Sequence, residues 1–251
     1  MRNAAVFLSL TLAIPAAAVS AGVVMEYEIK SAKDSTPMVG SLQVETDRLR
    51  MENAGMVVIY RADKDLVWMI NGQDKSYTEL TRAALEAMAK QMAEAMKALE
   101  TMPPEMRAKM QGMMGGAADN EPETLQKLGK SETINGFPCE AYQVSKGAKV
   151  VRTAWVTPFK KFDVKASDFA VMTKMAEFWK KAGGPFAKNM DKTFLADYSD
   201  EEKPGTLPGV PIRTVSGDTT HEIKKVAHET IAADRFEVPA GFKKSEMRMG
   251  R

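Results

Sequence analysis

The stretch RLRMENAGMVVIYRADKDLVWMING (residues 48–72) is the most informative part of the chain for its fold class. Leu49 and Met51 alternate with charged residues, which is the period-two pattern of a strand with one buried and one wet face. Residues 56–61 and 66–70 are two further strand-like runs separated by a short polar turn. The closing Asn-Gly pair is a strong signal for a tight hairpin turn. We therefore expect consecutive antiparallel hairpins here.

Further strand-like runs lie on both sides of this stretch, at residues 23–30, 39–45, 75–79, 137–145, 149–157, 209–216 and 219–229. Two segments, residues 81–100 and 166–181, instead have helical periodicity. The second segment has an apolar stripe made of Phe169, Met172, Met175, Ala176 and Trp179. This order of strands and helices predicts one α+β domain over residues 22–251. We expect a curved antiparallel sheet, a half-barrel, packed on or closed by amphipathic helices. A Met-rich helical insert at residues 80–116 includes a second predicted helix at 105–114.

Composition and charge exclude several classes of function. The chain has 35 Lys and Arg against 33 Asp and Glu, a net charge of +2. No basic excess is available to neutralise phosphates, so we expect no nucleic-acid partner. A single cysteine, Cys139, rules out an intrachain disulfide. Its apolar neighbours predict a buried thiol, with intermolecular pairing or a reactive thiol as the alternatives.

Enzymatic motifs fail when their spacing is tested. Two His-Glu pairs resemble the start of a zinc-binding helix, but the position four residues after each histidine holds Lys225 or Ala232. The odd spacing of His221 and His228 places them on opposite faces of a regular strand, as solvated side chains. A phosphate-loop resemblance lacks its first glycine, because that position is Thr124. We expect no catalytic residue, no metal site and no cofactor.

Residues 1–21 have the pattern of a secretory signal peptide. Arg2 supplies the positive start, and an uncharged apolar run follows it. Residues 19–21 form a small-residue cleavage signal before Gly22, and residues 16–18 form a rival signal. The apolar run is short for a membrane span, which needs ~20 residues. We expect a periplasmic protein with no integral membrane span after cleavage; a retained anchor is the alternative.

Methionine is unusually frequent, at 19 of 251 residues. One face of the first predicted helix carries Leu85, Met88, Met92, Met96 and Leu99. This stripe has several interpretations. It can be core that covers the sheet, or a flexible apolar lid over a cavity, since methionine surfaces adapt to varied partners. Its thioethers can also capture Cu(I) or act as an oxidant sink.

The order of these elements resembles an exported bacterial family of unknown function, the domain-of-unknown-function group 4412. The resemblance rests on residues 48–52, 58–61, 67–70, 75–77, 135–142, Trp155 and residues 236–242. More distantly, the chain is similar to periplasmic lipoprotein carriers of the Lol type. That similarity implies a half-barrel sheet closed by helices over an apolar cavity.

We therefore expect a non-catalytic cell-envelope protein that binds an apolar ligand, either a lipid, a lipoprotein or an apolar polypeptide, under a Met-rich helical lid. The predicted ligand-contacting residues are Leu85, Met88, Met92, Met96, Leu99 and Trp68. The alternatives are a Cu(I)-binding Met-rich periplasmic protein and a structural envelope protein without a ligand. The oligomeric state stays open.

Overall fold

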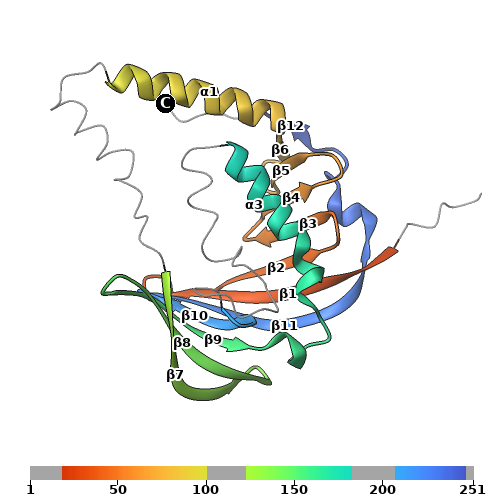
Figure 1. Cartoon of the computed structure of the whole chain (residues 1–251). Coiled ribbons are helices and arrows are strands. Elements are labelled where there is room, and N and C mark those ends of the chain that lie inside the picture. Colours follow the sequence, from red (N-terminus) through yellow and green to blue (C-terminus); the bar gives the residue numbers. More distant parts are fainter. Residues whose placement is uncertain (1–18, 101–122, 183–206, 247–251) are drawn as a thin grey trace, which may run out of the picture.

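A computed structural model of the chain describes residues 19–100, 123–182 and 207–246 (Figure 1). Twelve strands form one curved, unclosed sheet. The strands are β1 (Val19–Ser31), β2 (Met38–Val44), β3 (Arg48–Asn53), β4 (Met56–Arg61), β5 (Leu66–Asn71), β6 (Ser76–Thr81), β7 (Glu123–Ile134), β8 (Phe137–Lys146), β9 (Lys149–Thr157), β10 (Val210–Ser216), β11 (Thr219–Ala232) and β12 (Lys243–Lys244). The helices are α1 (Arg82–Glu100) and α3 (Ala170–Ala182), with 3-10 turns η1 (Phe159–Lys161), η2 (Ala166–Phe169) and η3 (Ala233–Phe236).

The described part of the chain is thus mostly β, and helices contribute less than an α+β class implies. The open, curved sheet is compatible with the expected half-barrel. Residues 1–18 of the predicted signal peptide and 101–116 of the predicted insert lie outside the described residues.

The strand order is β12-β6-β5-β4-β3-β2-β1-β11-β10-β9-β8-β7. Neighbouring strands are antiparallel, except that β12 runs parallel to β6. Strands β2 to β6 form the consecutive hairpins expected from residues 48–72. Two of the tight turns, at Ala54-Gly55 and Asn135-Gly136, have positive φ at both central residues. This is the type I′ geometry whose twist matches that of the flanking strands.

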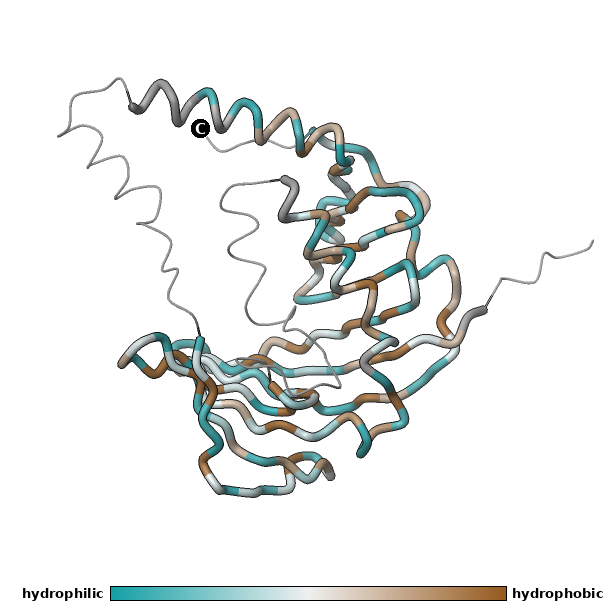
Figure 2. The backbone as a smooth tube through the Cα atoms, in the orientation of Figure 1, coloured by the Kyte–Doolittle hydropathy of each residue, from teal (hydrophilic) through white to brown (hydrophobic). Residues whose placement is uncertain are grey.

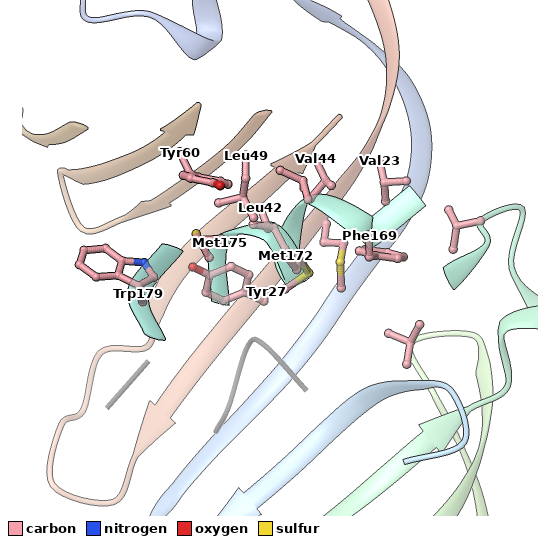
Figure 3. Close-up of a cluster of buried hydrophobic side chains, with 14 of the residues drawn as sticks. Val23, Tyr27, Leu42, Val44, Leu49, Tyr60, Phe169, Met172, Met175 and Trp179 are labelled. Atoms are coloured by element: carbon pink, nitrogen blue, oxygen red, sulfur yellow. The ribbon is translucent and has the colours of Figure 1, made fainter. Parts of the chain in front are cut away.

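Helix α3 covers one face of strands β1 to β5, and the main hydrophobic core lies between them (Figure 3). Successive side chains of a strand point to opposite faces of the sheet, so every second side chain faces the helix. Hydrophobic residues recur along these strands (Figure 2). On the helix, Met172, Met175 and Trp179 are buried, as the predicted stripe requires. Full burial of such a side chain stabilises the fold by about 1.5–3 kcal/mol.

The opposite face of this part of the sheet is also covered, by the chain that follows β11. After η3 this segment reaches β12, beside β6. Phe236 is fully buried there, at 0% exposure. It belongs to a second cluster with Val24, Val57, Ile59, Trp68, Ile70 and Ile231. Strands β4 and β5 are therefore buried on both faces.

The solvent-exposed face predicted for residues 48–52 is consequently wrong at Arg50. Leu49 belongs to the core beneath α3, as predicted, but Arg50 on the other face is only 7% exposed. Its guanidinium donates to the carbonyl oxygen of Arg235 (3.2 Å) and to the carboxylate of Glu52 (2.7 Å). The distant C-terminal segment thus buries Arg50 in the middle of this polar face, whereas the Glu52 side chain stays 41% exposed.

The placement of the two histidines on opposite faces is also wrong. Strand β11 pairs with β1 in the register Val23↔His228 and Ile29↔His221, with a register shift between these pairs. The extra residue in β11 is a β-bulge, which reverses the alternation of side chains. Both imidazoles therefore lie on one face. Burial lowers the pKa of His221, and His228 Nε2 lies 3.2 Å from an Asp168 oxygen.

Candidate functional site

Contacts with the sheet and with α3 hold the first turn of helix α1 in place. The hydroxyl of Thr81 accepts a hydrogen bond from the backbone amide of Ala84 (3.2 Å), which caps the helix N-terminus. The Arg82 guanidinium forms an ion pair with Asp65 in the turn between β4 and β5. It also lies over the ring of Phe178, 5.9 Å from the centroid. The first turn of α1 is thus held from three sides.

Two of the predicted ligand-contacting residues lie near the start of α1. Leu85 is 4% exposed and belongs to the core cluster beneath α3, and Met88 is partly buried against the same cluster. On the other side of the helix Lys90, Gln91 and Glu94 are exposed. Figure 1 shows the later turns of α1 leaving the sheet.

The other members of the predicted stripe lie on those later turns. The backbone of α1 is helical to Glu100, but the side chains of Met92, Met96 and Leu99 lie outside the described residues. The described side chains of Leu85 and Met88 therefore show which face of α1 turns toward the core, and that the apolar stripe begins at this contact.

Trp68 lies apart from these residues. It belongs to the cluster on the opposite face of the sheet, together with Phe236. Its indole nitrogen donates to Glu79 (3.0 Å), and the Lys64 ammonium lies 5.0 Å from the ring centroid. Leu85 packs into the core on one face of the sheet, and Trp68 points to the other face. The structure therefore does not bring Trp68 together with Leu85.

Aromatic side chains near the end of α3, and not Trp68, lie beside α1. Phe178 and Trp179 stack edge to face, with ring centroids 5.6 Å apart, and Phe178 lies 5.5 Å from the ring of Tyr60. We call this group, with Leu85 and Met88, the α1–α3 joint. Trp179 was visible in the sequence as part of the predicted stripe of α3, but the contact between the two helices was not.

The electrostatics of the joint favour apolar contacts. Burial raises the pKa of Tyr60 to about 12, so its phenol stays neutral at physiological pH. The Arg82 charge is balanced by Asp65, and the hydrogen bond between them raises the pKa of Arg82. The residues of the joint are themselves uncharged: Tyr60, Leu85, Phe178 and Trp179 are buried, and Met88 is partly buried against them.

Other candidate groups lie elsewhere in the fold. Cys139 is a buried free cysteine, as predicted, and its sulfur lies 3.2 Å from the Thr157 hydroxyl. Burial raises the pKa of its thiol. Within residues 19–100, 123–182 and 207–246, no group of three or more His, Cys, Asp or Glu side chains is placed to hold a metal ion. The helices in these ranges also include none long and apolar enough to cross a membrane.

Comparison with known proteins identifies a family. A family model described as "Domain of unknown function (DUF4412)" matches residues 9–242, which confirms the resemblance drawn from the sequence. A search of curated proteins gave no match.

Two solved structures have partial likeness to this chain. A structure of PNGF-II has 12% identity and a TM-score of 0.38, and the match covers 91% of this chain and 31% of that one. The Pseudomonas aeruginosa MucA/MucB complex has 7% identity and a TM-score of 0.41, covering 88% of this chain and 56% of that one. This chain thus spans about a third and just over half of those chains. Both TM-scores are below 0.5, and the relation to Lol-type carriers stays a prediction.

Proposed function

The chain belongs to the DUF4412 family, and we propose that it is a non-catalytic cell-envelope protein that binds an apolar ligand along α1. The ligand is an acyl chain or an apolar polypeptide segment, seated where α1 leaves the α1–α3 joint. The observation that carries the proposal is that the apolar stripe of α1 begins in the core, at Leu85 and Met88, and continues in sequence beyond that contact.

Helix geometry supports this position for the ligand. In the sequence, Met92, Met96 and Leu99 follow Met88 at spacings of four and three, which is the pattern of a helix with one apolar face. From Met88 to Leu99 the helix rises about 16 Å, at 1.5 Å per residue. A stripe of this length offers a linear apolar surface rather than a closed pocket.

Residue chemistry favours a ligand of variable shape. Methionine has three rotatable bonds and a polarizable sulfur, so a methionine surface adapts to apolar partners without a fixed outline. The exposed polar residues Lys90, Gln91 and Glu94 keep the other side of the helix in water. The cell-envelope location rests on the predicted signal peptide.

Substituting Met88, Met92 and Met96 together tests the proposal. Changing all three to leucine conserves volume, and such swaps usually cost less than about 1.5 kcal/mol each, so an apolar fluorophore should still bind. Changing all three to glutamine should abolish fluorophore binding, because burying an unpaired amide costs about 1–3 kcal/mol per residue. The measurement is a fluorescence titration of wild type and both variants, with a parallel Cu(I) titration.

A matched control uses two methionines far from α1. Met38 and Met56 are 43% and 48% exposed, and their change to glutamine should leave fluorophore binding intact. Tight Cu(I) binding without fluorophore binding, lost in the leucine variant, would replace the proposal with a copper site. Binding of neither probe would leave the stripe as core alone.

A further inference from the structure

The backbone at the predicted cleavage point lies very close to the end of strand β2. Val23 pairs with Val44, the last residue of β2, and Gly22 and Glu45 are the next residues beyond that pair. A Cβ built on Gly22 would lie 2.5 Å from the Val44 carbonyl oxygen and 3.1 Å from Cγ of Glu45. A side chain at position 22 would therefore clash, and the Glu45 side chain lies directly against the backbone of Gly22.

Glu45 is an unusually placed carboxylate. It is only 5% exposed, and one oxygen pairs with the Arg48 guanidinium at 2.9 Å. The other oxygen, Oε1, is buried and has no hydrogen-bond partner among the described residues. Burial raises the pKa of Glu45. The positive charges of Arg48 and Arg61 oppose this rise, and the negative charge of Asp47 adds to it. A half-satisfied buried carboxylate costs free energy unless another donor reaches it.

We propose that cleavage after Ala21 creates that donor, and that the new α-ammonium group of Gly22 forms a buried ion pair with Glu45. The cleaving enzyme, a signal peptidase, hydrolyses the amide between Ala21 and Gly22. Water supplies a hydroxyl to the Ala21 carbonyl carbon and a hydrogen to the Gly22 nitrogen. The amine that is released then binds a proton, because α-amino groups titrate near pH 8.

The neighbouring strands explain why Glu45 is the acceptor. Gly22 pairs with Glu229 on β11, but the Glu229 carboxylate already accepts from Lys225. In the uncleaved chain, residues 19–21 pair with residues 230–232. Cleavage removes these three pairs and puts a charge pair at the new end of β1. Cleavage at the rival site after Ala18 would keep the three pairs and leave the ammonium away from Glu45.

Two measurements on the exported protein test the proposal. Amino-terminal sequencing of the chain isolated from the envelope should begin at Gly22. With ¹⁵N-glycine labelling, the α-amino group of Gly22 should titrate at least about one pH unit above its ordinary range of ~8. Glu45→Gln should return that titration to the ordinary range, whereas the matched control Glu229→Gln should not.

A double-mutant cycle adds a readout of stability. Glu45→Gln should shift the unfolding equilibrium of the free-amine chain at least tenfold more than that of the same chain acetylated at Gly22. A first residue of Val19, an ordinary α-amino titration in wild type, or equal effects of Glu45→Gln in both chains would overturn the proposal. If the Glu45→Gln chain does not fold, the wild-type titration decides alone. Fluorophore binding at α1 is a separate readout, so the two proposals fail independently.

Discussion

Replacing Phe236 with alanine is expected to lower the free energy of unfolding by about 3–5 kcal/mol, the usual cost of Phe→Ala in a core. The ring is fully buried in a cluster with Ile59, Trp68 and Ile70, and its loss leaves a cavity among them. The carbonyl oxygen of Phe236 also accepts from the Arg61 guanidinium at 3.2 Å. Loosening the segment therefore removes a partner from a buried cation.

Urea unfolding at neutral pH measures this effect, with Phe242→Ala as the matched control. Phe242 lies on the same C-terminal segment but is only partly buried against the same cluster, so its removal should cost clearly less. Equal losses in the two variants would mean that the segment does not complete the core of the sheet.

Replacing Phe178 with alanine is expected to cost a similar 3–5 kcal/mol and to weaken ligand binding at the same time. Phe178 is 2% exposed and contacts Tyr60 on the sheet, Trp179 on its own helix and Arg82 at the start of α1. Removing it opens the α1–α3 joint from which the stripe of α1 extends. Urea unfolding and the fluorophore titration should both change.

The control for this variant is Glu177→Ala, one position earlier on α3. Glu177 is exposed, so its removal should change the free energy of unfolding by no more than about 0.5 kcal/mol. A loss of stability in Phe178→Ala with fully retained fluorophore affinity would place the ligand somewhere other than beside the joint.

The hairpins of this fold can be predicted from local sequence because their pattern and their turns agree. Residues 56–61 and 66–70 coincide with β4 and β5 to within a residue. The Asn135-Gly136 turn was also predictable, because both residues tolerate the positive φ that a type I′ turn needs. The helical stripe of α3 follows from spacing alone.

The remaining features depend on contacts between segments far apart in the chain. Arg50 has the periodicity of a solvent-facing residue, and only the arrival of Arg235 from the C-terminal segment buries it. The bulge that brings His221 and His228 to one face is set by pairing with β1, which no local pattern encodes. The strand that carries Trp68 is apolar on both faces, and its local sequence does not determine which face turns toward α1.

Trp68 and Trp179 lie on opposite faces of the sheet. Their positions provide the most direct test of the central claim, that an apolar ligand binds along α1. The measurement is fluorescence quenching by a brominated fatty acid in two variants, each retaining one of these tryptophans and carrying phenylalanine at the other two tryptophan positions. Trp179 lies at the α1–α3 joint and Trp68 under the C-terminal segment. Saturable quenching of Trp179 with little change at Trp68 is the predicted result, and quenching of Trp68 alone, or of neither, would contradict the claim.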